Sequence, residues 1–424
     1  MSRFWHSFAD MAALDASGEL VIDRGEGVHV WDEQGRRYLD ATAGLWYCNV
    51  GYGRGEIADA VAEQIRRLAA YSTFGDLSNR PAIELAERVS SFAPVGDSKI
   101  FLTSGGSDSI DTAAKMARRY WQLLGRPDRT LFITRERAYH GMHIAGTSLA
   151  GIEANAVGYG TLVGDVVKVA WDSPSELREA IAFATPERVA AFFCEPVIGA
   201  GGVFAPPEGY LEEVRSICRE TGVLFVADEV ITGFGRVGGW FASLRWDLEP
   251  DLLTCAKGIT SGYLPMGAVI AAPWVAEPFW QPGAGVWRHG YTYAGHATVA
   301  AAALANLDIM EREGLSRRAH SLEAELAAAL APLSEISLVD EVRAGVGVLA
   351  AVQLSAGAIA EDPSLPARVV QACRNHGIMT RALATGALQV SPALVIDDAA
   401  LRELGAGIAG ALGSVARRDP REGG

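Results

Sequence analysis

The chain has 424 residues, of which 49% are apolar and 21% are charged, a composition that excludes a disordered or fibrous protein and is ordinary for a globular enzyme. Its formal net charge of −14 argues against nucleic acid or an anionic membrane as a partner, because both need clustered positive charge. The five cysteines are scattered, with no C-x-x-C pair and no histidines at zinc-ligand spacing. We therefore expect no metal site and a reducing, cytoplasmic location.

The first 92 residues predict a hairpin, an aromatic loop and two helices. Residues 27–39 alternate around a turn at 33–35, which is typical of a β-hairpin. Residues 43–52 are rich in glycine and aromatic residues without a clear period, so they either cap a core or wall a binding pocket. The helical spacing of apolar residues over 56–70 and 82–92 predicts amphipathic helices.

Residues 99–124 predict a short strand, a glycine turn and a helix. The turn carries the hydroxyls of Ser104, Ser107 and Ser109 beside two glycines. Backbone N–H groups at the start of a helix, with hydroxyls added, bind phosphate well, although ordinary helix capping produces the same pattern. No Walker motif and no G-x-G-x-x-G motif occurs, which argues against a nucleotide site of the usual kind.

From residue 130 onward, apolar strands alternate with amphipathic helices. The predicted strands cover residues 130–134, 166–170, 189–196 and 223–229, and helices are predicted over 174–183 and 210–221. This order indicates an α/β fold in which helices cover both faces of a mostly parallel sheet. Ligands of such sheets bind beyond the carboxyl ends of the strands.

The last third of the chain changes in character. After residue 310, helices and strands follow one another in an order that indicates a smaller α+β domain. The longest apolar stretch, 297–310, is interrupted by Asn306 and Asp308, so we expect a buried helix there and no membrane span. The N-terminal residues lack the basic segment and apolar run of a signal peptide.

Lys257 is one of only four lysines and follows the apolar run 252–256. An unpaired charge is costly in such a setting, and burial lowers the pKa of a lysine, which leaves a neutral amine able to attack a carbonyl group. The alternative is a surface lysine at the end of a strand. Lys257 is therefore a candidate nucleophile that needs support from other residues.

Asp228 supplies such support, because it follows the apolar run 223–227 and the sheet would bring it to the same edge as Lys257. A helix N-cap or a buried ion pair would also explain an aspartate there. One cofactor accounts for the lysine, the aspartate and the phosphate cup together, namely pyridoxal 5′-phosphate (PLP). Its aldehyde condenses with a lysine, its ring nitrogen needs a carboxylate, and its phosphate needs N–H and hydroxyl donors.

Longer motifs resemble a known family. The sequences V-A-D-E-V-I-T-G-F-G-R at 226–236 and A-K-G-I-T-S-G-Y-L-P-M-G-A at 256–268 resemble the class III aminotransferases of PLP fold type I. Four more motifs, at 43–46, 135–141, 195–203 and 289–296, resemble the pyruvate-dependent ω-aminotransferases. The resemblance implies a large PLP-binding domain over 56–312. It also implies a smaller α+β domain formed by the N-terminal segment 1–55 and the C-terminal segment 313–424.

The resemblance also implies roles for individual residues. The implied catalytic residues are Lys257, which forms the Schiff base and moves the proton, and Asp228, which pairs with the ring nitrogen. The implied cofactor site consists of Gly105, Gly106, Ser107, Tyr139, Glu195, Asp228, Val230, Lys257 and Thr292. Within this set the glycines and the serine hold the phosphate, while Tyr139 and Val230 flank the ring. Thr292 reaches the cofactor of a neighbouring subunit, which implies a homodimer with shared sites and leaves open a tetramer.

The implied substrate site is formed by Trp46, Phe74, Tyr139, Tyr291 and Arg381. In the resembling family a mobile arginine binds the carboxylate of the keto acid, and Arg381 takes that position here, with Glu195 able to neutralise it when no carboxylate is bound. The aromatic residues would shape the pocket for an apolar or extended amine. His140 and His143 are interpreted as structural, since the lysine moves the proton in this family.

The expected activity is transfer of an amino group from an ω-amino acid or amine donor to a keto acid, pyruvate by resemblance, in a ping-pong Schiff-base mechanism. A PLP-dependent aminomutase or epimerase on the same fold is the alternative, since it would share the whole cofactor set. A PLP-fold protein kept only for binding would show a degraded lysine or phosphate cup, and neither is degraded. A nicotinamide oxidoreductase would need the dinucleotide motif that the chain lacks.

Overall fold

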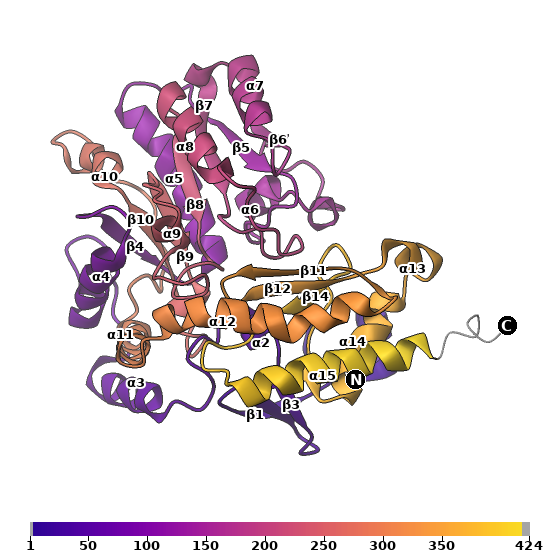
Figure 1. The fold of residues 1–424 in the computed structure, drawn as a ribbon. Helices are drawn as coiled ribbons and strands as arrows, with labels where there is room; N and C mark the ends of the chain where they lie inside the picture. The colour runs from indigo at the N-terminus through magenta and orange to yellow at the C-terminus, as the bar shows by residue number, and fades with distance from the viewer. Residues whose placement is uncertain (1–2, 418–424) are drawn as a thin grey trace.

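The structure, a computed structural model, describes residues 3–417 and is organised around a seven-stranded sheet in the order β4-β10-β9-β8-β7-β5-β6 (Figure 1). Its strands are β4 (Lys99–Thr103), β5 (Leu131–Arg135), β6 (Val166–Val169), β7 (Val189–Cys194), β8 (Leu224–Asp228), β9 (Leu252–Cys255) and β10 (Gly267–Ala271). Strands β6, β5, β7, β8 and β9 run parallel, and β10 is antiparallel to both of its neighbours. The predicted mostly parallel sheet is confirmed.

Both faces of this sheet are buried, which explains its near-continuous apolar strands. Successive residues of a strand point to opposite faces, so Phe192 belongs to one core cluster and Phe193 to another, and Phe225 and Val226 divide in the same way. The helices that contact its strands include α5 (Gly106–Leu123), α6 (Ile144–Leu149), α7 (Pro174–Ala184) and α8 (Tyr210–Thr221). Helix α10 (Pro273–Trp280) packs against α5, and the short helix α9 (Ala242–Arg245) follows β8 in the chain. Every predicted strand and helix of this region is present, with ends shifted by a residue or two.

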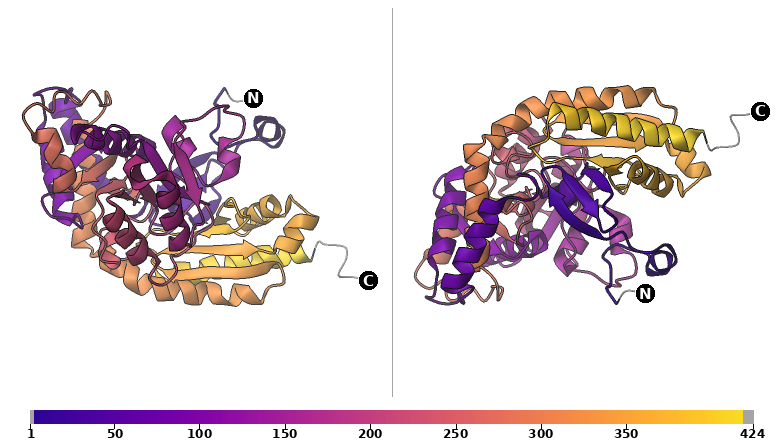
Figure 2. Two further views of the ribbon diagram at one scale, coloured as in Figure 1. Left: turned by 90° about the horizontal axis from the view of Figure 1, so that it is seen from above. Right: turned by 90° about the horizontal axis from the view of Figure 1, so that it is seen from below.

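The N-terminal and C-terminal segments share a second sheet, in the order β1-β2-β3-β13. Its strands are β1 (Ile22–Glu26), β2 (His29–Asp32), β3 (Arg37–Asp40) and β13 (Ile378–Met379), of which β2 and β3 form the predicted hairpin and β13 pairs parallel with β3. Figure 2 shows the N-terminal strands beside the C-terminal helices. The smaller α+β part is therefore built from both ends of the chain.

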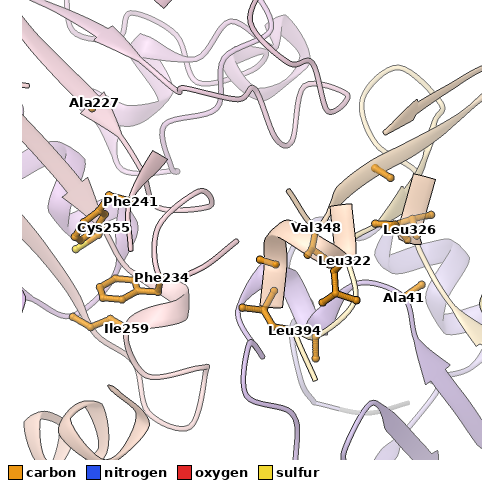
Figure 3. Packing of buried hydrophobic residues seen from close by; sticks show 14 of the residues in the cluster. Ala41, Ala227, Phe234, Phe241, Cys255, Ile259, Leu322, Leu326, Val348 and Leu394 are labelled. Atoms are coloured by element: carbon orange, nitrogen blue, oxygen red, sulfur yellow. The ribbon is translucent and has the colours of Figure 1, made fainter. Parts of the chain in front are cut away.

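A third sheet, β11 (Val339–Val346), β12 (Leu349–Leu354) and β14 (Leu388–Val390), completes this part. The accompanying helices are α12 (Leu315–Leu330), α13 (Ala356–Glu361), α14 (Leu365–Asn375) and α15 (Asp398–Ala416). One core cluster runs from the large sheet into the smaller part, and Figure 3 shows Phe234 and Cys255 on one side of it and Leu322 and Leu394 on the other. Apolar packing thus joins the two parts.

The remaining helices are α1 (Met11–Ser17), α2 (Ala43–Trp46), α3 (Gly55–Leu68), α4 (Arg80–Phe92) and α11 (Ala297–Arg312), with short 3-10 helices at Glu153–Ala156, Pro186–Arg188, Lys257–Ile259 and Ala331–Glu335. Helix α11 packs against α3 and α4, and ten of its residues are buried, as the sequence predicts for 297–310. Among the helices of residues 3–417, none combines the length and apolar character that a membrane crossing needs.

Candidate active site

A cavity of about 430 Å³ lies where β7, β8 and β9 end and α5 begins. Eight of the nine residues of the implied cofactor site line it, namely Gly105, Gly106, Ser107, Tyr139, Glu195, Asp228, Val230 and Lys257. Glu195 and Asp228 stand at the carboxyl ends of β7 and β8, and Lys257 follows β9 after one residue. The parallel sheet therefore gathers these side chains at one edge, as such sheets do.

The turn between β4 and α5 forms a cup at one end of this cavity. Gly105 is the N-cap of α5 with extended backbone, and Gly106 begins the helix. A Cβ atom on Gly106 would lie 2.9 Å from Cγ1 of Val230, so a larger residue would fill the cup. The oxygen of Ser107 accepts a hydrogen bond from the N–H of Met142 at 3.1 Å, which fixes its position. N–H groups at the start of a helix attract anions, so the cup is suited to a phosphate.

Asp228 is held by three groups while it is only 4% exposed. Its Oδ1 accepts hydrogen bonds from the N–H of Val230 and the hydroxyl of Thr254, both at 3.1 Å, and its Oδ2 lies 2.7 Å from Nδ1 of His140. Asp228 is the last residue of β8 and caps no helix. The contact with His140 instead resembles the buried ion pair that the sequence left open as an alternative. Together, the three contacts fix the direction of the Asp228 carboxylate.

His140 and Thr254 are residues whose contribution the sequence reasoning missed. His140 is 1% exposed, and its Nε2 atom has no hydrogen-bond partner within residues 3–417. Thr254 is completely buried on β9. A polar residue inside an otherwise apolar strand was the available signal for Thr254, because buried hydroxyls need a partner. The sequence interpretation of His140 as structural did not include its partner, Asp228, which is a candidate catalytic residue.

Lys257 lines the cavity with an unusual backbone and an altered pKa. Its φ of +46° is left-handed, a conformation that costs free energy in a residue other than glycine. Burial lowers the pKa of its amine from the usual 10.5 to about 8, while the carboxylates of Asp228 and Glu195 act in the opposite direction. A lysine with this pKa is partly neutral near physiological pH, which is the form that attacks a carbonyl group.

Glu195 uses both of its oxygens within its own loop. Oε1 accepts a hydrogen bond from the N–H of Tyr139 and Oε2 from that of Gly199, each at 3.0 Å. Burial raises the pKa of this carboxyl, and His140 and the two N–H donors act against that rise. Among the ion pairs of residues 3–417, none joins Glu195 to Arg381. The neutralising pair that the sequence led us to expect is therefore absent among the described residues, and the two N–H donors hold the Glu195 carboxylate within its own loop.

Arg381 instead contacts a neutral residue and an aromatic ring. Its Nε donates a hydrogen bond to Oε1 of Gln389 at 2.7 Å, and its guanidinium carbon lies 4.6 Å from the ring centre of Trp46. Nζ of Lys257 lies 5.9 Å from the centre of the same ring. Burial lowers the pKa of Arg381, which still stays a cation at physiological pH. Lys257 lines the cavity whereas Arg381 does not, and the two positive groups share one aromatic neighbour.

Trp46 is 2% exposed, and its ring is the shared neighbour of Lys257 and Arg381. Its Nε1 donates a hydrogen bond to the hydroxyl of Ser391 at 3.0 Å, and its φ is +63°. The neighbours Leu45 and Tyr47 line the cavity, whereas Trp46 is not among the lining residues. The loop 43–52 therefore forms part of the pocket wall, which is the second of its two predicted alternatives. It does so through the residues on either side of Trp46.

Phe74, Tyr291 and Thr292 do not line the cavity of their own chain. Phe74 is 55% exposed and Thr292 is exposed, while the hydroxyl of Tyr291 donates a hydrogen bond to the backbone oxygen of Asp108 at 3.1 Å. The expectation that Phe74 and Tyr291 shape the pocket is thus not met within one chain. The physical reason is that their loops lie on the outer side of α5, where Gly290 approaches the ring of Phe74.

Comparison with known proteins identifies the family. The model of the family "Aminotransferase class-III" matches residues 12–412. The putrescine–pyruvate aminotransferase of Pseudomonas aeruginosa is 38% identical over 95% of this chain and 93% of that protein. A thermostable (S)-enantioselective omega-transaminase from Thermomicrobium roseum is 38% identical, with a TM-score of 0.93 over 97% of this chain and 96% of that one.

A third comparison concerns the cofactor. The PLP-bound structure of an amine transaminase from an uncultivated Pseudomonas species is 35% identical to this chain, with a TM-score of 0.93 over 98% of this chain and 99% of that one. The likeness in fold and sequence extends over almost all of both chains. This chain belongs to the class III aminotransferases, PLP-dependent enzymes of fold type I that transfer amino groups.

Proposed function

We propose that this aminotransferase moves an amino group from an ω-amino acid or an amine to pyruvate by a ping-pong reaction. The observation that carries the proposal is the position of Arg381, a cation without a protein carboxylate partner in residues 3–417, over the same Trp46 ring as Lys257. A guanidinium group binds a carboxylate in a bidentate manner, so the site suits an acceptor that carries one. The relative from Pseudomonas aeruginosa, whose name includes pyruvate, supports this acceptor.

The residues around the cavity fit PLP. When bound, PLP supplies an aldehyde that takes up the amine and a ring that withdraws electrons from the reacting carbon. Gly105, Gly106 and Ser107 would hold its phosphate, since the cup at the start of α5 offers N–H donors and leaves no room for a Cβ at position 106. Asp228 would pair with the ring nitrogen, because its carboxylate is buried and fixed by three donors.

Four more residues would position the ring and move the proton. Tyr139 and Val230 line the cavity and would flank the ring, and Glu195 would fix the loop of Tyr139 by its hydrogen bond to that N–H. Lys257 would be the covalent anchor of the cofactor. Its Nζ, once free, would take the proton from the substrate Cα, because burial lowers its pKa to about 8 and leaves part of the amine neutral.

Arg381 would bind the carboxylate of pyruvate, with the Trp46 ring supporting the guanidinium. Tyr139, which lines the cavity, would also limit the space for the amine, whereas Trp46 would act through the guanidinium of Arg381. Phe74, Tyr291 and Thr292 lie outside the cavity of their own chain, and we assign them to the site of a second subunit. The exposure of Phe74 and Thr292 supports a homodimer with shared sites. Five free cysteines support a cytoplasmic location.

The test is a panel of amines incubated with the PLP-loaded enzyme, with and without pyruvate. Amino-group transfer predicts that amine is lost only when pyruvate is present and that alanine forms in equal amount. Racemisation or internal migration of the amino group without an acceptor would show an epimerase or an aminomutase instead. Loss of amine with 2-oxoglutarate but not with pyruvate would overturn the proposed acceptor and leave amino-group transfer intact.

A further inference from the structure

We propose that Gln389 is a positioning residue that holds Arg381 ready for a carboxylate without neutralising it, and that residue 389 thereby determines which end group the substrate site accepts. This inference rests on the proposed function, because it concerns how Arg381 receives pyruvate. Gln389 lies on β14, eight residues after Arg381, and it is completely buried. A buried amide needs partners for its oxygen and its nitrogen.

Both ends of the Gln389 side chain have such partners. Oε1 accepts the hydrogen bond from Nε of Arg381 at 2.7 Å, and Nε2 donates to the backbone oxygen of Thr42 at 3.4 Å. The backbone is fixed as well, because the N–H of Gln389 donates to the oxygen of Arg381 at 3.0 Å and its oxygen accepts from the hydroxyl of Thr380 at 2.7 Å. If the amide were rotated by half a turn, its NH2 group would face the N–H of Arg381, and both groups are donors. The amide therefore has one favourable orientation.

This arrangement leaves the substrate-binding side of Arg381 available. Among the hydrogen bonds of residues 3–417, the guanidinium uses only Nε, and its two terminal nitrogens have no protein partner. One face of the guanidinium lies 4.6 Å from the Trp46 ring centre. The paired terminal N–H groups are those that bind a carboxylate in a bidentate manner. Gln389 therefore fixes the direction of the guanidinium by the one nitrogen that the substrate does not need.

The neutrality of Gln389 has a consequence for specificity. Glu195, the nearby carboxylate able to cancel the charge of Arg381, already accepts hydrogen bonds from Tyr139 and Gly199. The positive charge of Arg381 is therefore not cancelled by an ion pair in the described part of the chain, and a second positive charge on the substrate is repelled while Arg381 stays in place. A carboxylate at position 389 would reverse this preference by pairing with Arg381. The site as it stands favours an anionic end group over a cationic one.

The experiment compares Gln389→Met, which removes the hydrogen bond, with Gln389→Glu, which adds a charge partner. With the PLP-loaded enzyme, both variants are expected to raise the KM for pyruvate by about tenfold or more, as loss of a hydrogen bond to a charged group implies. The KM for butylamine, which has no second charge, should stay within about twofold, because Gln389 acts only through Arg381. Gln389→Glu alone should lower the KM for the diamine 1,4-diaminobutane.

Binding of propionate, an unreactive carboxylate, measured by calorimetry supplies a readout that does not depend on turnover. Its dissociation constant should rise in both variants in parallel with the KM for pyruvate. Gln371→Met and Gln371→Glu are the matched controls, because Gln371 is exposed on α14 and bonds to Asn375 alone among the described residues. These controls should leave both constants unchanged.

The outcomes separate this inference from the proposed function. Unchanged pyruvate KM and propionate affinity in correctly folded Gln389 variants would overturn the role of Gln389, even if the enzyme uses pyruvate. A wild-type enzyme inactive with pyruvate would overturn the proposed function, whereas propionate binding would still decide the role of Gln389. If Gln389→Met fails to fold, Gln389→Glu decides alone, since Arg381 supplies a partner for the buried carboxylate.

Discussion

Nδ1 of His140 lies 2.7 Å from Oδ2 of Asp228, and both side chains are almost completely buried where β8 ends. A carboxylate that pairs with a ring nitrogen acts as the acceptor, so Nδ1 of His140 would be the donor in this contact. Thr254 and the N–H of Val230 donate to the other carboxylate oxygen. These three contacts therefore fix the direction of the Asp228 carboxylate, which is what a partner for the PLP ring nitrogen requires.

Replacing His140 with Phe tests this support. The change removes one donor from Asp228 and keeps an aromatic ring beside Phe193. We expect kcat to fall by about 10- to 100-fold, because the lost hydrogen bond involves a charged group, with little change in the KM of either substrate. The measurement is steady-state kinetics together with the pH dependence of kcat. The control is His143→Phe, which removes an exposed contact with Asp108, and equal losses in both variants would contradict the account.

The lowered pKa of Lys257 has a signature in the stability of the cofactor-free protein. Between pH 8 and 10.5 the unfolded chain binds more protons at this lysine than the folded chain does, so the stability of the wild type rises with pH across that window. Below pH 8 the folded state carries the full cost of the buried charge. We expect Lys257→Met to be more stable than the wild type there, by up to about 3 kcal/mol, with the difference disappearing towards pH 10.5.

Urea unfolding of the two cofactor-free proteins at a series of pH values measures this difference. Lys115→Met is the control, because Lys115 lies on the outer side of α5 beside His289. A stability difference between the wild type and Lys257→Met that does not vary with pH would show that burial does not lower the pKa of this lysine.

Replacing Gly106 with Ala tests the phosphate cup. The added Cβ would lie 2.9 Å from Cγ1 of Val230, so either the cup or the Val230 side chain must shift. We expect the dissociation constant of PLP to rise by about tenfold or more, since a small displacement of several N–H donors weakens each of them. Gly96→Ala is the matched control, because nothing lies within 4 Å of a Cβ atom there. Equal PLP affinity in both variants, titrated by absorbance, would place the phosphate elsewhere.

Replacing Arg381 with Leu separates the two half-reactions. We expect kcat/KM for pyruvate to fall by about 100-fold or more, because a bidentate pair of charged groups is lost. The half-reaction with an amine that lacks a carboxylate should stay within a few-fold of the wild-type rate. Arg368→Leu, which removes the exposed pair with Asp362, is the control. If both half-reactions fell together, Arg381 would serve the fold of the site and not the carboxylate.

Mixed subunits test whether Thr292 serves a neighbouring site. Lys257→Ala and Thr292→Ala should each be poorly active alone. A dimer with one subunit of each kind places both defects in one site and leaves the other intact, so refolding an equal mixture should restore about a quarter of the wild-type activity. No recovery in the mixture, with dimers shown by light scattering, would mean that Thr292 acts within its own chain.

The large sheet and several of the residues that line the cavity could be predicted from the sequence for a physical reason. Buried parallel strands are apolar along their whole length, and their carboxyl ends meet at one edge. A polar residue at the end of such a strand can therefore be assigned to this edge from the sequence alone. Lys257, Asp228 and Ser107 were found in this way. The domain limits at residues 55 and 312 stay a prediction.

The substrate side was harder to predict, because it depends on contacts between distant segments. Trp46 has a φ of +63° in a loop without a period, so the pattern of residues did not predict where its ring would lie. Gln389 is a single polar residue in an apolar strand, a signal for a buried hydrogen bond that does not name the partner. The sequence led us to expect Glu195 beside Arg381, but two backbone N–H groups hold the Glu195 carboxylate within its own loop, and Gln389 contacts Arg381 instead.

The central claim is that Lys257 is the covalent anchor of PLP. The most direct measurement is reduction of the PLP-loaded enzyme with borohydride, followed by digestion and mass spectrometry of the labelled peptide. The account predicts one modified residue, Lys257, and no label in Lys257→Ala treated in the same way. A label on Lys115, or no label on the wild-type protein, would contradict it.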